Sequence, residues 1–147
     1  MPQNPPEGMP AMTPLLYFRE LASALDWLSK ALGFETRSKL AGPDGAIVHA
    51  EMQLGDAVIM LGPPSDEEKT RSPSDLPAVS QSLYVYVDDV DAHFANAKAQ
   101  GATITLEPED KFWGDRMYYA QDCEGHHWNF AQHVKDVAPE DMKPPGA

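Results

Sequence analysis

The sequence has only one cysteine and lacks a long hydrophobic run, and each of these two features excludes a class of protein. The single Cys123 cannot form an internal disulfide, and a zinc site built from several thiolates is excluded for the same reason. Its neighbours Asp122 and Glu124 are acidic, which disfavours the thiolate that a cysteine nucleophile needs. No apolar run approaches the roughly 18 residues of a membrane span, and no secretory leader is recognisable. We therefore expect a cytoplasmic protein without a membrane partner.

Basic residues are also scarce: 11 Lys and Arg stand against 23 Asp and Glu, which gives a formal net charge of -12. Such a charge repels phosphate backbones and anionic membrane surfaces, so nucleic acid is not an expected partner. The 147 residues suffice for one ordinary domain, or for two small modules that share a core.

Proline is abundant, with 14 residues, but its distribution is uneven. Five prolines fall in residues 1–14, four in 62–77 and three in 139–147. Proline-rich termini predict extended tails, and a polar, proline-rich stretch inside the chain predicts a linker. The predicted organisation is a flexible tail over 1–12, a module over 13–62, a linker over 63–80, a module over 81–134 and a second flexible tail over 135–147.

Hydrophobic periodicity and turn residues predict the same order of elements in both halves. The first half has a strand at 15–18, a helix at 21–33 and strands at 34–40, 47–54 and 57–61; the second has a strand at 82–87, a helix at 90–101 and strands at 102–106, 116–121 and 126–132. Adding 69 to a position of the first half gives its counterpart, so Met60 corresponds to Asn129. The predicted fold is α+β: two tandem βαβββ modules whose strands form a curved mixed sheet around a groove.

Strand side chains alternate between two faces, and in each module the apolar set should face the helix. That set is Leu16, Phe18, Val48, Ala50, Met52, Ile59, Leu61, Leu83, Val85, Val87, Trp128 and Phe130. The other set should line the groove, and concave aromatic surfaces are the usual sites for small molecules. The predicted ligand-binding residues, including one from a loop, are Tyr17, His49, Glu51, Met60, Tyr84, Tyr86, Trp113, Tyr118, His127 and Asn129.

The pairing of the last two strands in each module decides which side chains reach the groove. A two-residue turn in the first module places Glu51 opposite Met60. A four-residue turn over 122–125 in the second module places Tyr118 opposite Asn129. Both predictions depend on the length of a turn.

Three stretches carry a resemblance to a known family: the helix ALDWLSKALGF, the hairpin HAEMQLGDAVIMLG and the closing segment WGDRMYYAQDCEGHHWNF. Together with the paired βαβββ modules, they make residues 13–132 similar to the vicinal oxygen chelate superfamily. This superfamily includes glyoxalase I, extradiol dioxygenases and the bleomycin resistance proteins. The resemblance implies the two-module fold.

In the metal-dependent members of this superfamily, the ligands come from the first and last strands of each module. Those positions match Thr13, Met60, Ser82 and Asn129 in this sequence. Two hydroxyls, a thioether and an amide supply no negative charge, whereas a divalent transition metal favours imidazole, carboxylate or thiolate donors. We therefore expect no metal or other cofactor at this place.

The stretch EPEDKFWGDRMYYAQDCEGHHWNF, in which a Trp-Gly pair precedes the penultimate strand, resembles the metal-free, drug-binding branch of the superfamily. Bleomycin resistance proteins are dimers that sequester a cationic antibiotic with an aromatic tail. The resemblance implies a homodimer that binds a small organic ligand, aromatic or cationic, and sequesters it as in drug resistance. An acidic protein with a tyrosine-rich groove suits such a ligand, because aromatic faces stack on planar rings and attract cations.

Three alternatives stay open. His49, Glu51 and His127 could form a displaced metal site in a glyoxalase-like lyase or dioxygenase, whereas the adjacent His126 and His127 point to opposite faces of a strand. A metal-free enzyme could use Glu51 or His127 as a general base. The tyrosines could instead pack together as core, with Trp113 against its own hairpin.

Overall fold

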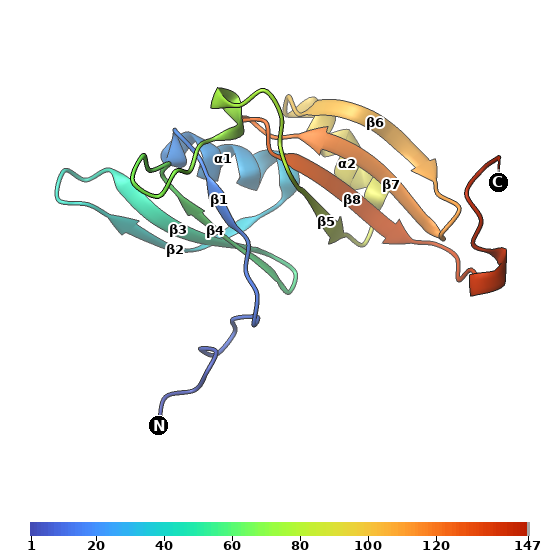
Figure 1. Cartoon of the computed structure of the whole chain (residues 1–147), viewed down its shortest axis with the longest axis horizontal. Coiled ribbons are helices and arrows are strands. Elements are labelled where there is room, and N and C mark those ends of the chain that lie inside the picture. Colours follow the sequence, from blue (N-terminus) through green and yellow to red (C-terminus); the bar gives the residue numbers. More distant parts are fainter. Residues whose placement is uncertain (147) are drawn as a thin grey trace. The chain divides into compact units, whose positions relative to one another are not determined.

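The computed structural model describes residues 1–146, which form two compact units divided between Ala78 and Val79. Over the residues described, each unit contains one four-stranded sheet and one α-helix in the order β-α-β-β-β (Figure 1). The predicted α+β fold of two βαβββ modules is confirmed. None of the helices in this part of the chain is long and apolar enough to cross a membrane.

The first unit has the strand order β1-β4-β3-β2, in which β1 runs parallel to β4 and the other neighbours are antiparallel. Its elements are β1 (Leu15–Tyr17), α1 (Leu21–Leu32), β2 (Glu35–Ala41), β3 (Ile47–Leu54) and β4 (Ala57–Gly62). The turn after β3 has two residues, so Glu51 pairs with Met60 as predicted.

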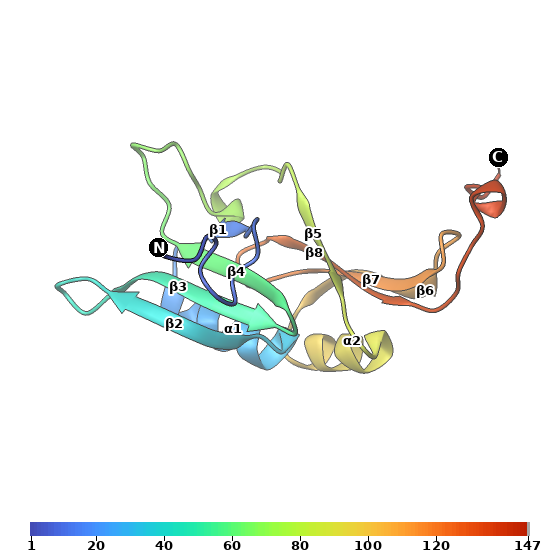
Figure 2. The ribbon, with the colours of Figure 1, turned by 90° about the horizontal axis from the view of Figure 1, so that it is seen from below.

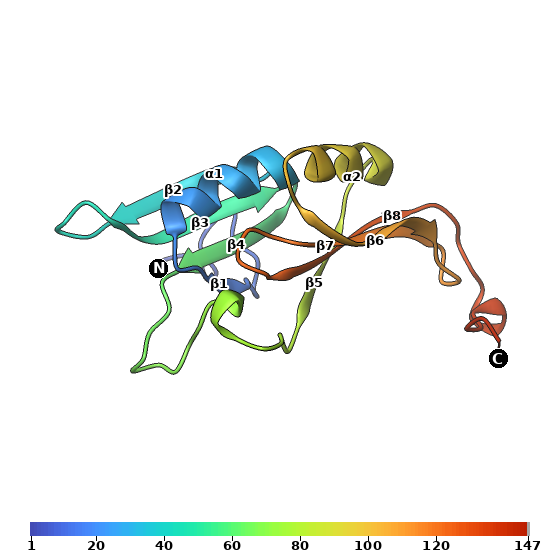
Figure 3. The ribbon, with the colours of Figure 1, turned by 90° about the horizontal axis from the view of Figure 1, so that it is seen from above.

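Helix α1 covers one face of the first sheet (Figure 3). The buried residues of α1 recur at helical spacing, and the helix ends at Gly33, whose φ of +83° favours glycine. The strand residues that form the core with it are Leu16, Phe18, Ala50, Met52, Ile59 and Leu61, all buried. Val48 was predicted to join them but is 40% exposed, because the β2–β3 hairpin extends past α1.

The second unit has the strand order β5-β8-β7-β6, with β5 parallel to β8. Its elements are β5 (Ser82–Tyr86), α2 (Val90–Ala99), β6 (Thr103–Asp110), β7 (Asp115–Gln121) and β8 (His127–His133). Asp89 caps α2 by accepting a hydrogen bond from the backbone of Ala92. Short 3-10 turns at Pro73–Asp75 and Pro139–Asp141 lie outside the two modules.

The pairing of β7 with β8 differs by one residue from the prediction. Tyr119, not Tyr118, pairs with Asn129, because the connecting turn occupies residues 122–126 and not 122–125. Since side chains alternate along a strand, this single step reverses the two faces of β7. Tyr118 consequently faces the helix side and is completely buried.

The longer turn is built around the carboxylate of Asp122. Its Oδ1 accepts hydrogen bonds from the backbone N–H groups of Glu124 and His126, both at 3.0 Å. Its Oδ2 accepts one from the indole of Trp128 at 2.9 Å, and the His126 ring lies 3.0 Å away. Asp122 and Trp128 are both buried, so this carboxylate joins the turn to the core of the second unit.

The internal repeat is confirmed by the strand pairing. Leu15 pairs with Met60, and their counterparts 69 positions later, Tyr84 and Asn129, also pair. The hairpin breaks the regular spacing, since Glu51 and Tyr119, the partners of Met60 and Asn129, lie 68 positions apart.

Replacement of Asp122 by alanine should lower the free energy of unfolding of the second unit by about 2 to 3 kcal/mol, because buried donors lose their acceptor. Urea unfolding followed by circular dichroism measures the change. The exposed Asp88→Ala is the matched control and should change stability by less than about 0.5 kcal/mol. Equal stability of the two variants would contradict this role for Asp122.

Candidate ligand-binding site

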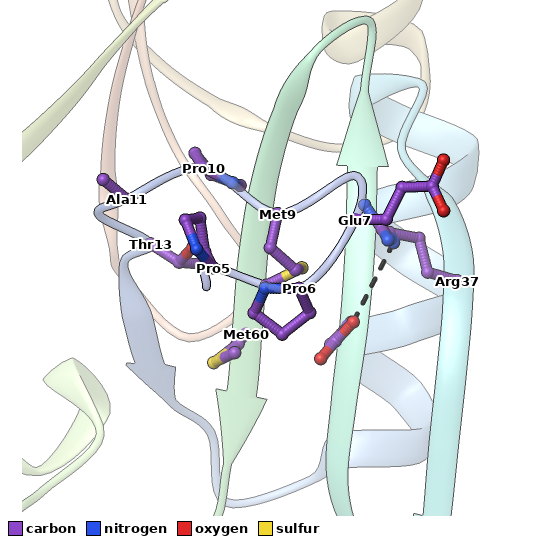
Figure 4. A pocket seen from close by; sticks show the side chains of 10 residues that line it. Pro5, Pro6, Glu7, Met9, Pro10, Ala11, Thr13, Arg37 and Met60 are labelled. Carbon is purple, nitrogen blue, oxygen red and sulfur yellow. Dashed lines mark ion pairs between the residues drawn. The ribbon is translucent and has the colours of Figure 1, made fainter. Parts of the chain in front are cut away.

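The open face of the first sheet, opposite α1, carries the N-terminal segment of the chain (Figure 2). Residues 5–11 arch over β3 and β4 and border an open cavity of about 530 Å³ (Figure 4). The cavity is lined by Pro5, Pro6, Glu7, Met9, Pro10, Ala11, Thr13, Arg37, Glu51 and Met60. The flexibility of the tail over 1–12 stays a prediction.

Arg37 on β2 links the N-terminal segment to the sheet. Its Nη1 donates a hydrogen bond of 2.9 Å to the carbonyl of Gly8, and its Nε lies 3.8 Å from Oε1 of Glu51. Gly8 has a φ of +78°, which favours glycine, and a turn closes through the Met9 N–H to the Pro6 carbonyl. The cavity therefore combines walls of proline and methionine with one partly exposed ion pair.

The open face of the second sheet carries an exposed pair of tyrosines on β5. Tyr84 is 45% exposed and Tyr86 is 60% exposed, and their ring centroids lie 5.6 Å apart. In the pairing of the strands, Asn129 on β8 lies between Tyr84 and Tyr119 of β7. This face therefore places several aromatic side chains next to one another.

The buried carboxylate of Asp115, at the start of β7, organises these tyrosines. The hydroxyls of Tyr84 and Tyr86 both donate to its Oδ2, at 2.5 and 2.8 Å, and Nδ1 of His133 lies 2.8 Å from its Oδ1. Asp115 itself is only 2% exposed. We call Tyr84, Tyr86, Asp115 and His133 the Asp115 cluster.

Trp113 extends the Asp115 cluster from the loop between β6 and β7. Its indole N–H donates a hydrogen bond of 3.0 Å to the hydroxyl oxygen of Tyr84, and the ring of Phe112 packs edge-on at 4.9 Å. Gly114 follows with a φ of +101°, which favours glycine and permits a tight turn. A Cβ at Gly114 would lie 1.9 Å from the carbonyl oxygen of Lys135, so no other residue fits.

The hydrogen bonds of the Asp115 cluster set its charges. Burial opposes the ionisation of Asp115, but hydrogen bonds from Tyr84, His133 and Tyr86 outweigh it, so the pKa of Asp115 lies below its usual value. The pKa of Tyr84 is raised by burial and by its bond to Asp115, and that of Tyr86 chiefly by its bond to Asp115. The carboxylate is therefore ionised and both phenols are protonated.

His133 is held between two carboxylates. Nδ1 faces Asp115, and Nε2 lies 2.7 Å from Oδ1 of Asp136. A neutral imidazole has only one N–H donor, so two carboxylate neighbours favour the doubly protonated ring. These hydrogen bonds, first to Asp136 and then to Asp115, raise the pKa of His133.

The structure corrects the predicted place of Tyr118. Its hydroxyl lies 2.6 Å from Nδ1 of His93 on α2, its ring stacks on Phe130 at 5.4 Å, and burial raises its pKa. The residue that takes its predicted position on the open face is Tyr119, with Nζ of Lys111 lying 5.2 Å from the ring centroid.

The other predicted ligand-binding residues are distributed over both units. Glu51 and Met60 line the cavity of the first unit, whereas Tyr17 and His49, half-buried, are not among its lining residues. In the second unit, Nε2 of His127 lies 3.2 Å from the side-chain amide of Gln121. The ligand-binding roles of these residues stay predictions.

The donor chemistry at the positions of the family's metal ligands does not fit a divalent transition metal. Thr13 and Met60 offer a hydroxyl and a thioether to the cavity, and Ser82 and Asn129 offer a hydroxyl and an amide. Within residues 1–146, no three His, Cys, Asp or Glu side chains are grouped so that they could hold a metal ion. His49 and Glu51 lie in the first unit, and His127 lies in the second.

Cys123 is exposed and has a weakly acidic thiol. Partial desolvation of the sulfur, together with the charges of Asp122 and Glu124, raises the pKa of Cys123 to about 12. A thiol with this pKa supplies almost no thiolate at neutral pH, as its acidic neighbours in the sequence indicated.

Sequence reasoning missed Asp115, His133 and Arg37 as site residues. The predicted strand covered residues 116–121, so Asp115 lay outside it and the Trp-Gly-Asp stretch was not joined to the tyrosines of β5 in one cluster. The predicted last strand ended at residue 132, whereas β8 continues to His133, which lies opposite Asp115. Arg37 gave no signal, because its partner is a backbone carbonyl of the N-terminal segment.

A fold of two βαβββ modules with open sheet faces defines a class of binding proteins and enzymes. The family within this class follows from the sequence. The chain belongs to the Glyoxalase/Bleomycin resistance protein/Dioxygenase superfamily, whose family model matches residues 12–130.

Two similar proteins share about a third of their residues with this chain. The uncharacterized protein Rv0887c of Mycobacterium tuberculosis is 34% identical over 137 residues, which cover 91% of this chain and 81% of that protein. TioX from Micromonospora sp. ML1 is 33% identical, and its crystal structure matches with a TM-score of 0.68 over 84% of this chain and 98% of TioX.

TnmS3, an antibiotic binding protein from Streptomyces sp. CB03234, shares the fold. It is 20% identical, with a TM-score of 0.64 over 84% of this chain and 96% of TnmS3.

His133 should titrate above the ordinary histidine value of 6.5, because the folded state stabilises its cationic form. Its contribution to stability is fully present below pH of about 6.5 and is lost as the pH rises through the raised pKa. NMR titration of the histidine ring protons, assigned with His133→Gln, measures the midpoint. Asp136→Asn should lower it, and a midpoint at or below 6.5 would contradict the doubly protonated ring.

Proposed function

We propose that the protein binds a small organic ligand with an aromatic or cationic group and sequesters it without turnover. The observation that carries this proposal is the exposed pair Tyr84 and Tyr86, held in place from below by the buried Asp115. Large aromatic side chains gain contact energy when a planar ring stacks on them. Membership of the superfamily supports the proposal, since one of its named branches is the bleomycin resistance proteins.

The fixed geometry of the rings favours binding. Hydrogen bonds to Asp115 and from Trp113 hold the Tyr84 hydroxyl, so the ring has lost rotational freedom before a ligand arrives. Affinity rises when the ordering cost is met in the free protein. The cavity of the first unit, about 530 Å³, offers a further apolar surface of the size usual for small-molecule sites.

The chemistry of the side chains favours binding over catalysis. The phenols of Tyr84 and Tyr86 have raised pKa values and donate hydrogen bonds to Asp115, so both stay protonated and neither acts as a base at neutral pH. Asp115 is buried and fully engaged by three hydrogen bonds. The cluster has no activated nucleophile, and its hydrogen bonds orient the aromatic rings.

Trp113→Ala should weaken the binding of an aromatic ligand by about tenfold, the loss expected for one stacking residue. Calorimetry and tryptophan fluorescence, with a panel of planar aromatic drugs and methylglyoxal–thiol adducts, measure the affinity. Trp27→Phe on α1 is the control and should leave it unchanged. Unchanged affinity in Trp113→Ala, or one metal ion per purified chain together with turnover of an adduct, would contradict the proposal.

The proposal includes a homodimer, as in the drug-binding branch that the sequence resembles. Light scattering during size-exclusion chromatography should give about twice the chain mass of 16.2 kDa. A mass equal to that of one chain at micromolar concentration would contradict this part of the proposal, which is independent of ligand binding.

A further inference from the structure

We infer that the Asp115 cluster selects ligands that donate hydrogen bonds, and therefore binds aromatic cations in preference to aromatic anions of the same size. The inference rests on the proposed function and names the chemical class of its ligand. Its basis is the direction of the hydrogen bonds between Tyr84, Tyr86 and Asp115.

An ionised carboxylate only accepts hydrogen bonds. Because Asp115 Oδ2 lies 2.5 Å from the Tyr84 hydroxyl and 2.8 Å from the Tyr86 hydroxyl, both phenol protons point toward the buried carboxylate. The lone pairs of the two phenol oxygens are left for other partners. A tyrosine that would otherwise donate or accept has thus become an acceptor.

The two phenol oxygens differ in what they can offer a ligand. The Tyr84 oxygen accepts a hydrogen bond from the indole of Trp113, which is a donor only. Tyr86 is the more exposed of the pair, at 60%, and its oxygen keeps lone pairs for a ligand. Donation to a charged acceptor makes a hydroxyl oxygen a better acceptor in turn, so Tyr86 is the main contact for an N–H group.

The charges around the cluster also favour a cation. Asp115 and Asp136 flank the single imidazolium of His133, which leaves an excess of one negative charge in this chain of hydrogen bonds. Lys111 has its Nζ 5.9 Å from the Trp113 ring centroid and 2.6 Å from Oε1 of Glu109. An anionic ligand would meet acceptor oxygens and a lysine that already has a carboxylate partner.

A purely structural role for Asp115 makes a different prediction. If the carboxylate only fixes the two rings, then any planar ligand of suitable size binds, whatever its polar group. If the carboxylate also sets the direction of the hydrogen bonds, then the polar group decides the affinity. A matched pair of ligands distinguishes the two roles.

The test compares naphthylmethylammonium with naphthoate, which share a ring system and differ in charge, on the full chain at physiological salt. Wild-type protein should bind the cation at least about tenfold more tightly. Tyr86→Phe keeps the ring and removes the acceptor, so it should weaken binding of the cation and leave that of naphthoate nearly unchanged.

Asp115→Asn should reduce the preference for the cation more than Tyr86→Phe does. An amide N–H can donate a hydrogen bond to a phenol oxygen, which frees a tyrosine proton to point outward. The control is Asp56→Asn, which changes the formal charge of -12 by the same amount in the exposed turn after β3 of the first unit. It should retain the wild-type preference. The affinities of Tyr86→Phe for the two probes test the role of the cluster independently of how well the Asp115 variant folds.

The outcomes separate this inference from the proposed function. Equal affinity for the two probes in wild-type protein would overturn the selectivity and leave aromatic binding intact. A preference for the cation that persists unchanged in both Tyr86→Phe and Asp115→Asn would overturn its assignment to the cluster. Failure of both probes, and of the drug panel, to bind would overturn the proposed function together with the inference.

Discussion

The ionised carboxylate of Asp115 is the group on which the open face of the second sheet depends. It is almost completely removed from solvent, and a buried charge is stable only when hydrogen bonds or an opposite charge compensate it. Tyr84, Tyr86 and His133 provide that compensation, and each is thereby held in one position. The exposed aromatic surface is therefore ordered by a charge that hardly contacts water itself.

The position of that carboxylate depends in turn on a glycine. The Gly114 carbonyl accepts hydrogen bonds from the backbone of Val134 and Lys135, which brings the segment after β8 against the loop before β7. Only a residue without a Cβ permits this approach, since an added Cβ would overlap the Lys135 carbonyl. The Trp-Gly-Asp sequence is thus one structural unit: Trp113 contributes the ring, Gly114 the close contact and Asp115 the buried charge.

The sequence was sufficient to predict the fold, because period-two alternation and a shared spacing of 69 residues are local signals that tertiary contacts did not override. The sequence was insufficient to predict which side chains of β7 lie on each face of the sheet, because the length of the turn between β7 and β8 is decided by one side chain. The Asp122 carboxylate holds a five-residue turn by bonding to the backbone of His126 and the indole of Trp128, and no propensity scale contains that geometry. One misplaced residue was enough to exchange Tyr118 and Tyr119.

The two modules share a backbone pattern and use it for different surfaces. At equivalent positions, Met60 faces proline side chains of the N-terminal segment, whereas Asn129 lies between two tyrosine-bearing strands. Neither residue supplies negative charge to a metal, so the proposed binding of a ligand relies on contact area and on the direction of hydrogen bonds. Rings fixed before the ligand arrives meet that requirement, because their ordering cost is borne by folding and not by binding. Under the proposed function, donor groups too weak for a metal and a preordered aromatic face serve the same end, which is to hold a ligand without acting on it.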